Sequence, residues 1–225
     1  MIKKLLASIL IIGTLFGFSL FDFFQKKPEN QTNTNISLEN ILAVSWEKNF
    51  CDLNRYKKEC KTLNPTHYAW NHFVLHGLWP QPRSKQNCSY KFERLPKDLW
   101  EELKIYMPGV VSGLAKHEWI KHGSCYGKSE EEYFKDAIKL LKQVNYSAIR
   151  DFFIAYEGEV ITKQMLNQAI KKSFGNVTRK IQMICQKGKI VELRFSLKGD
   201  PAKKSLMELL KDAKPLRGGC QRGRI

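Results

Sequence analysis

The chain has 225 residues, a length that suits one well-packed domain, and no internal repeat or long low-complexity tract suggests a second. Its formal net charge is +16, which favours a polyanionic partner such as nucleic acid, or an anionic surface. A solvated, lysine-rich surface would give the same charge, so the charge alone does not define a chemistry.

The N-terminus is typical of an export signal. Two lysines precede an apolar run over residues 5–24, after which the sequence becomes polar. The run is just long enough to span a bilayer, but Asp22 lies inside its end. We therefore favour a signal peptide over residues 1–24 rather than an uncleaved membrane anchor. Residues 25–38 are predicted to form a disordered leader, followed by one domain over 39–225.

Alternating or short apolar runs predict four strands within the domain. They lie at residues 41–46, 72–76, 180–185 and 190–197. The last strand alternates from Val191 onward, so that Val191, Leu193, Phe195 and Leu197 face one side. Lys187-Gly188 is expected to form a hairpin-like turn between the last two strands.

Helices are predicted between these strands, at residues 96–107, 113–122, 129–144 and 162–174. Ser129 and Glu132 match a capping box, Thr162 is a weaker N-cap, and Gly175 is a plausible end for its helix. Strands at both ends of the domain with helices between them indicate an α+β fold rather than alternating βαβ units.

All six cysteines follow the apolar N-terminal run: Cys51, Cys60, Cys88, Cys125, Cys185 and Cys220. No C-x-x-C pair is present, and an even number in an exported chain favours disulfides over zinc. Six cysteines allow fifteen pairings, and their spacing does not choose among them.

Two short blocks hold an unusual concentration of groups that transfer protons or bind anions. The first is His76-Gly77-Leu78-Trp79-Pro80, and the second runs from His117 to Cys125 as HEWIKHGSC. On a helix, Glu118, Lys121 and His122 would share one arc, with His117 at its edge and Gly123 as a C-cap. Histidine titrates near neutral pH, and lysine provides a compact positive charge.

Other chemistries fit these blocks less well. A zincin places two histidines four residues apart, whereas the H-E-x-x-x-H spacing here separates them by about 140° around a helix. Ser124 lacks the G-x-S-x-G context of a serine hydrolase. The cysteines are expected to form disulfides, which argues against a cysteine nucleophile.

Acid–base chemistry by one histidine from each block remains, and this is the equipment that cleavage of RNA by internal transesterification requires. Each residue also has an ordinary structural explanation: His76 could support a strand end, Glu118 and Lys121 could form a helix pair, and Trp79 could belong to the core. Their joint occurrence in two blocks favours the catalytic interpretation.

The two blocks resemble the active-site segments of the ribonuclease T(2) family, and the resemblance extends over roughly residues 40–220. It implies that His76 is the general acid, His122 the general base and His117 a phosphate ligand. Glu118 and Lys121 would stabilise the pentacovalent intermediate or tune the histidines. Trp79 would help to position the base or ribose. The 42–46 strand, Met107-Pro108-Gly109 and Cys125-Tyr126-Gly127 look closest to the bacterial branch of the family.

The resemblance further implies a central antiparallel sheet flanked by helices, 2′,3′-cyclic phosphate products and little base preference. It suggests Cys88–Cys125 and Cys185–Cys220 bridges, with Cys51–Cys60 closing a small loop. Many eukaryotic members carry Gln-Trp-Pro where this chain has Ser45-Trp46-Glu47. Because that glutamine contributes to a base site, the resemblance does not define the base preference of this chain.

We therefore expect an exported endoribonuclease that cleaves single-stranded RNA and not DNA, requires no metal or cofactor, and acts as a monomer without an obligate protein partner. One alternative is a catalytically inactive, cationic exported protein that binds RNA or a surface on the same scaffold. An anchored envelope protein that acts on membranes is a third possibility, which depends only on the apolar N-terminus and the charge.

Overall fold

The computed structural model describes residues 36–225, so the predicted export signal and most of the predicted leader lie outside the described residues. The last part of that leader, residues 36–38, is described. Ser37 is buried there, and its amide donates a 2.8 Å hydrogen bond to the Tyr126 carbonyl. Within residues 36–225, no helix combines the length and the hydrophobicity that crossing a membrane would require.

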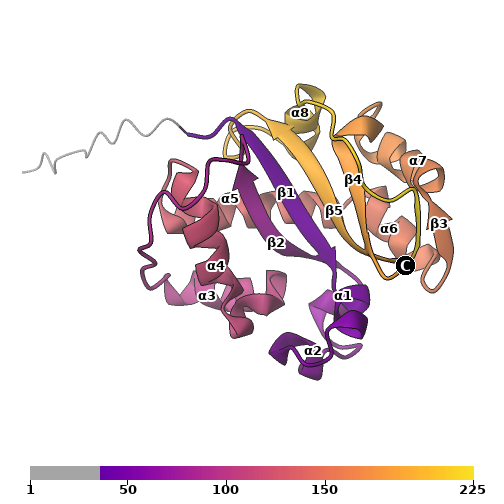
Figure 1. The fold of residues 1–225 in the computed structure, drawn as a ribbon, viewed down its shortest axis with the longest axis horizontal. Coiled ribbons are helices and arrows are strands. Elements are labelled where there is room, and N and C mark those ends of the chain that lie inside the picture. The colour runs from indigo at the N-terminus through magenta and orange to yellow at the C-terminus, as the bar shows by residue number, and fades with distance from the viewer. Residues whose placement is uncertain (1–35) are drawn as a thin grey trace, which may run out of the picture. The chain divides into compact units, whose positions relative to one another are not determined.

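A six-stranded sheet forms the centre of the described fold (Figure 1). Its strands are β1 (Glu39–Trp46), β2 (Phe73–Pro80), β3 (Val160–Thr162), β4 (Ile181–Gln186), β5 (Lys189–Lys198) and β6 (Arg222–Arg224). They follow the order β2-β1-β5-β6-β3, and β4 pairs with β5. Neighbouring strands are antiparallel except β5 and β6, which meet in parallel at Lys189 and Arg224. The expected antiparallel sheet is confirmed, apart from this one parallel pair.

Helices surround the sheet, and α5 lies across one face of it, behind β1 and β2 in Figure 1. The helices are α1 (Glu47–Leu53), α2 (Lys58–Thr62), α3 (Lys97–Tyr106), α4 (Leu114–Lys121), α5 (Glu130–Asn145), α6 (Ala148–Ala155), α7 (Lys163–Phe174) and α8 (Leu206–Lys211). Helices α3 and α4 lie beside β2, whereas α6 and α7 lie near β3. The predicted α+β class is confirmed.

The elements predicted from the sequence are all present. Their ends lie within two residues of the predicted ones, except that β2 continues four residues further. Ser129 and Glu132 form the predicted capping box, and the Thr162 side chain caps α7. Lys187 and Gly188 have φ angles of 47° and 78°, a left-handed conformation that suits a tight hairpin turn.

Six shorter elements were not predicted: α1, α2, α6, α8, β3 and β6. Helix α1 starts at Glu47, directly after β1 ends at Trp46, and no turn residue marks the boundary. Helices α1 and α2 have seven and five residues, so tertiary contacts must hold them, because isolated helices of this length are unstable in water. The Cys51–Cys60 disulfide joins the two.

The other two disulfides are Cys88–Cys125 and Cys185–Cys220. All three pairings agree with those that the family resemblance implied. Cys88–Cys125 fixes the chain just after α4, where the second histidine block ends, and Cys185–Cys220 ties the end of β4 to the C-terminal segment.

Two side chains of α5 hold β2 from the side opposite to β1. The Asn145 side chain accepts a 2.8 Å hydrogen bond from the Phe73 amide and donates one of 2.9 Å to the Phe73 carbonyl. The Tyr133 hydroxyl does the same further along the strand, with the amide and carbonyl of Leu78. Since these residues lie on either side of His76, α5 fixes the strand segment that carries this histidine.

An aromatic cluster fills the core where β1 ends and β2 begins. The rings of Trp46, Phe73 and Phe153 contact one another, mostly edge to face, at centroid distances of 4.7 to 5.1 Å. All three side chains are buried, and replacing a buried aromatic residue by alanine typically costs about 3–5 kcal/mol. The cluster therefore anchors the start of β2 from inside the domain.

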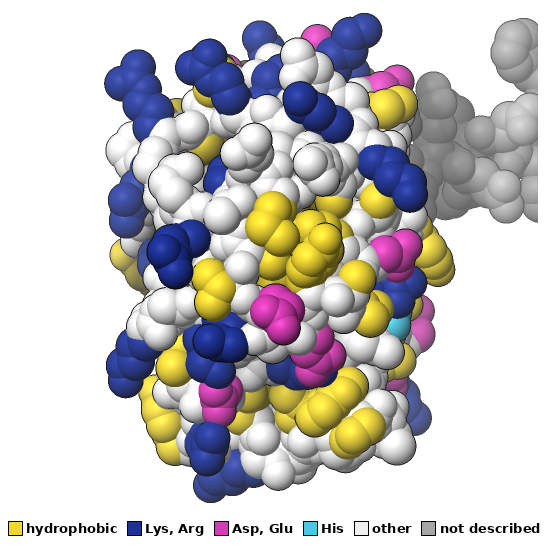
Figure 2. Space-filling view, turned by 90° about the vertical axis from the view of Figure 1, so that its right-hand side faces the viewer, with side chains coloured by type: hydrophobic (Ala, Val, Ile, Leu, Met, Phe, Trp, Pro, Cys, Tyr) yellow, Lys and Arg dark blue, Asp and Glu magenta, His cyan; other side chains and the backbone are white. Residues whose placement is uncertain are grey.

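On the face that carries α7 and β3, the positively charged side chains are spread out rather than gathered in one patch. Figure 2 shows lysine and arginine side chains scattered over this face, with polar and hydrophobic groups and a few carboxylates between them. A dispersed charge of this kind attracts polyanions over a long range but does not itself define a binding site.

Candidate active site

His76 lies at a β-bulge in β2. The register between β1 and β2 shifts between Ala43 and Val44, which leaves His76 as the extra residue in its strand. Residues three apart in a regular strand point to opposite faces. Here the bulge brings His76 and Trp79 to the same face, with ring centroids 5.2 Å apart. Bulges commonly redirect a side chain in this way.

Two buried carboxylates flank the His76 ring. Nδ1 of His76 lies 2.5 Å from Oε2 of Glu192, and Nε2 lies 3.6 Å from Oε1 of Glu118. Burial opposes protonation of this imidazole, but the hydrogen bond and charge of Glu192, together with Glu118, outweigh it and raise the pKa of His76. His76 is therefore held as an imidazolium to higher pH than an exposed histidine.

Glu192 keeps its charge despite its burial. Burial acts to raise the pKa of Glu192, but the hydrogen bond and charge of His76, with Arg194, lower it. Nε of Arg194 donates a 2.5 Å hydrogen bond to the other Glu192 oxygen. The guanidinium carbon of Arg194 in turn lies 5.0 Å from the centre of the Trp79 ring, a cation–π distance.

Glu118 projects from α4 and is only 1% exposed. Its Oε2 accepts a 2.7 Å hydrogen bond from the Trp79 indole N–H. Burial raises the pKa of Glu118, and the nearby His76 and the Trp79 hydrogen bond partly offset this effect. Gly77 makes the arrangement possible, because a Cβ there would lie 2.1 Å from Glu118 Oε2 and 2.6 Å from Trp79 Nε1.

His122 lies at the end of α4 rather than within it. The helix ends at Lys121, and His122 takes the C-cap position with φ −126° and ψ −54°. The expectation that Gly123 would be the C-cap is therefore wrong. Gly123 is instead a packing requirement, since a Cβ there would lie 2.5 Å from the ring of Trp119.

The His122 ring lies beside Trp79, with centroids 5.3 Å apart and planes tilted by 32°. Its side chain is largely removed from solvent. Burial, followed by the positive charge of Lys121 and of other nearby cations, lowers the pKa of His122 to about 4. This imidazole is therefore neutral over most of the acidic and neutral range.

His117 and Lys121 complete the group from α4. His117 is exposed and lines a cavity together with His76. Burial and the charge of Lys121 lower the pKa of His117. The two predicted histidines of the second block do diverge, because His117 faces the cavity beside His76 whereas His122 packs against Trp79.

Glu192 and Arg194 were not predicted as site residues from the sequence. Both lie on β5, on the strand face opposite to the predicted apolar row, and β1 places them across from Ser45 and Ala43. The signal was present, because Glu192 is an acidic residue in the middle of a buried strand. Nothing local, however, connects it to His76, which lies 116 positions away in the sequence.

The arrangement can carry out acid–base catalysis. Both imidazoles lie next to the Trp79 ring, and their pKa values are shifted in opposite directions. One can be protonated while the other is neutral at the same pH, which is the pairing that a general acid and a general base require.

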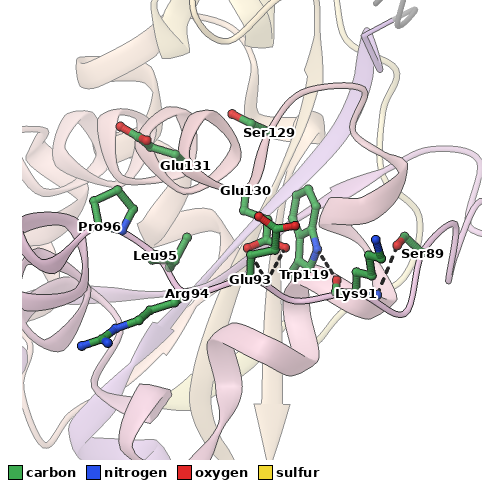
Figure 3. A pocket seen from close by; sticks show the side chains of 10 residues that line it. All are labelled: Ser89, Lys91, Glu93, Arg94, Leu95, Pro96, Trp119, Ser129, Glu130 and Glu131. Atoms are coloured by element: carbon green, nitrogen blue, oxygen red, sulfur yellow. Dashed lines mark hydrogen bonds between the residues drawn. The ribbon is translucent and has the colours of Figure 1, made fainter.

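A cavity of about 420 Å³ opens beside His76 and His117 and extends towards α1 and α2. Another, of about 490 Å³, lies at the N-terminus of α5 (Figure 3). Trp119 lines this second cavity, and its indole N–H donates a 2.8 Å hydrogen bond to the Lys91 carbonyl. Trp119 therefore anchors the segment before α3.

Few of the described residues are arranged to hold a metal ion. Within residues 36–225, the one group of three potential ligands in reach of one another is Glu47, Cys51 and Cys60. The two sulfur atoms are bonded to each other, so they are not available as thiolates, and a single carboxylate remains.

Comparison with known proteins agrees with this fold. The model of the Ribonuclease T2 family matches residues 39–208. Ribonuclease I of Escherichia coli is 25% identical over 200 residues, covering 71% of this chain and 75% of that protein. A ribonuclease of Aeromonas hydrophila is 40% identical over 131 residues, covering 57% and 56% of the two chains. Ribonuclease T2-A of Mus musculus is 32% identical over 120 residues, but the match spans only 46% of its length.

Solved structures share the fold at low sequence identity. The self-incompatibility SF11-RNase of Nicotiana alata has a TM-score of 0.60 at 22% identity, covering 81% of this chain and 94% of that one. RNase NT in complex with 5′-AMP has a TM-score of 0.55 at 20% identity, covering 83% and 96%. Since the family model spans most of the chain and includes both histidine blocks, this protein belongs to the Ribonuclease T2 family.

Proposed function

We propose that this chain cleaves single-stranded RNA by transesterification, with His122 as the general base and His76 as the general acid. The observation that supports this most strongly is the pair of imidazoles beside Trp79, whose pKa values are shifted in opposite directions. Family membership supports the same reaction class.

In the first step, neutral His122 accepts the proton of the ribose 2′-OH, and the 2′-oxygen attacks the phosphorus. The bond from phosphorus to the 5′-oxygen breaks, and His76 donates its proton to the leaving oxygen. The products are a 2′,3′-cyclic phosphate and a free 5′-hydroxyl. When water opens the cyclic phosphate, the roles reverse: His76 takes a proton from water, and His122 returns one to the 2′-oxygen.

The remaining groups would hold the phosphate and the two imidazoles in place. Lys121 would contribute positive charge to the phosphate, and the His117 ring would donate a hydrogen bond to it. Glu118 would orient His76 and the Trp79 indole, both of which it contacts. Because Trp79 also packs against Arg194 and both catalytic rings, we assign it mainly a positioning role.

The pKa shifts set the pH range of the reaction. His122 becomes protonated and can no longer act as the general base as the pH falls through its pKa of about 4. The acid is lost as the pH rises through the His76 pKa, which is raised above its ordinary value of 6.5. We expect kcat/KM to be highest between these limits, in the mildly acidic to neutral range.

A direct test compares the wild type with His76→Ala and His122→Ala on a fluorescent single-stranded RNA. Removing a general acid or base should lower kcat/KM by about 10²–10⁴-fold. His67→Ala is a matched control, because His67 is exposed. Within residues 36–225 its ring forms a hydrogen bond only with the nearby Asn64 side chain. Mass spectrometry after brief digestion should show cyclic phosphate ends.

Three results would contradict the proposal. Near-wild-type cleavage by His76→Ala or His122→Ala would contradict the assignment of these residues as general acid and general base. Equal cleavage of a DNA strand of the same sequence would exclude a mechanism that needs the 2′-OH. Loss of activity in EDTA, restored by a divalent ion, would show that a metal takes part.

The same assay separates the enzyme from an inactive cationic binding protein on this scaffold. A binding protein would retain RNA, with an affinity that falls steeply with salt, but would leave the strand intact. Persistence of intact RNA with the wild type at every pH between 4 and 8 would favour that alternative.

We also propose that the protein is exported. The three disulfides support this, because such bonds form and persist in oxidising compartments. Cell fractionation and N-terminal sequencing of the mature protein would test it. Recovery of the reduced protein from the cytosol would contradict it.

A further inference from the structure

The cavity beside His76 and His117 is also lined by three charged side chains, those of Glu47, Glu59 and Lys57. Its volume of about 420 Å³ lies in the range of 300–1,000 Å³ typical of small-molecule pockets. Phe50 and Leu114 supply apolar surface, whereas Glu47 and Glu59 contribute carboxyl groups. A planar base could lie against the apolar side chains while its polar edge meets the carboxyl groups.

Glu47 is a buried acid without a hydrogen-bond donor in the described residues. It is the first residue of α1 and is only 4% exposed. Within residues 36–225 its one side-chain hydrogen-bond contact, at 3.8 Å, is with the Cys51 sulfur, which is bonded to Cys60 and has no proton to donate. Glu59 differs, because its carboxylate accepts a hydrogen bond from the Ser112 hydroxyl. Glu47 thus lines the cavity with its hydrogen-bonding capacity unused.

The charged neighbours of Glu47 leave it poised between two protonation states. Burial and the nearby Glu59 raise the pKa of Glu47 to about 7, and His76 and Lys57 only partly oppose them. His117 is the other titratable group that lines the cavity. Glu47 is therefore neutral in mildly acidic solution and becomes a carboxylate above neutral pH.

The location of the cavity identifies which nucleotide would enter it, and this step depends on the proposed function. His76 donates its proton to the leaving 5′-oxygen in that mechanism. The cavity is lined by His76 and His117, and neither His122 nor Trp79 is among its lining residues in the described part of the chain. The base of the leaving nucleotide, on the 3′ side of the cut, is thus the one placed to enter.

We propose that Glu47 selects the base on the 3′ side of the cut, preferring guanine when it is ionised and adenine or cytosine when it is protonated. The two oxygens of a carboxylate accept two parallel hydrogen bonds, and guanine alone presents two adjacent donors, N1–H and the N2 amino group. A neutral carboxyl offers one donor and one acceptor. That pattern matches the amino group and ring nitrogen on the pairing edge of adenine or cytosine.

The test uses dinucleotides with cytidine on the 5′ side: CpG, CpA, CpC and CpU. Ratios of kcat/KM are measured at pH 5 and pH 8.5, so that the titration of the catalytic histidines, common to all substrates, cancels. We expect the CpG-to-CpA ratio to rise about 5- to 150-fold between these pH values, the discrimination that one bidentate pair provides.

Glu47→Gln is the decisive variant, because its amide keeps the size of the side chain and fixes the donor–acceptor pattern of the neutral acid. Its CpG-to-CpA ratio should be low and the same at both pH values. Glu101→Gln, an exposed change on α3 where Glu101 pairs with Lys104, should behave like the wild type. In the reversed series GpC and ApC, the ratio should be unaffected by Glu47→Gln.

The outcomes separate this inference from the proposed function. If the wild type cleaves neither these dinucleotides nor a longer single-stranded RNA, the proposed function fails. If it cleaves them and Glu47→Gln retains the wild-type ratios and their pH dependence, Glu47 does not read the base. A pH-dependent effect confined to the reversed series would show that the cavity receives the base on the 5′ side.

Discussion

Replacing Glu47 by glutamine should make the fold more stable at alkaline pH. A group whose pKa is higher in the folded than in the unfolded state stabilises the fold below its unfolded pKa, and this stability is lost as the pH rises through its folded value. For Glu47 the two values are 4.5 and about 7. At 1.36 kcal/mol per pKa unit, ionising Glu47 in the folded protein therefore costs about 3 kcal/mol.

Urea unfolding of wild type and variant at pH 4 and pH 8.5 measures this cost, with the disulfides intact. The two proteins should have similar free energies of unfolding at pH 4, where the acid is neutral and resembles an amide. At pH 8.5 the variant should be more stable by about 3 kcal/mol. Glu101→Gln, an exposed change, should stay within about 0.5 kcal/mol of the wild type. A constant difference between wild type and Glu47→Gln at both pH values would refute the reasoning.

Three further predictions concern the site and its supports. Glu192→Gln removes the charge that raises the pKa of His76, so the alkaline limb of kcat/KM and the NMR titration of His76 should both move to lower pH; an unmoved limb would show that Glu192 does not tune the acid. Gly77→Ala forces a methyl group into the site and should lower kcat/KM by about 10²-fold with an unchanged circular dichroism spectrum, whereas full activity would mean that the site tolerates the displacement. Replacing both Cys88 and Cys125 by serine removes a link across 37 positions and should lower the free energy of unfolding by about 4 kcal/mol, and a loss below 1 kcal/mol in urea would contradict this estimate.

The sequence predicted those elements whose signals are local. Ser129 and Glu132 mark the start of α5 because a capping box depends on four consecutive residues, and Lys187-Gly188 marks a turn for the same reason. Helices α1, α2 and α8 have fewer than eight residues each. Packing and a disulfide rather than a periodic pattern hold such elements, so local signals did not reveal them.

The site divides in the same way. His76, Glu118 and His122 belong to two compact blocks whose composition is unusual. In the structure all three contact Trp79: the two imidazoles lie beside its ring, and Glu118 accepts a hydrogen bond from its indole N–H. The bulge at His76 and its partner Glu192 depend on strand register and on a pairing over a long sequence separation. One sequence does not specify register, which is why these features emerged only from the structure.

The two contacts that α5 makes with β2 also affect how the protein behaves in a crowded solution. Strand β2 lies at the edge of the sheet, where free amides and carbonyls invite pairing with a strand of another molecule. Asn145 and Tyr133 occupy these groups at Phe73 and Leu78. Intermolecular sheet extension along the histidine-bearing strand is thereby blocked at two points, which protects a cationic enzyme that must remain dispersed to meet its polymeric substrate.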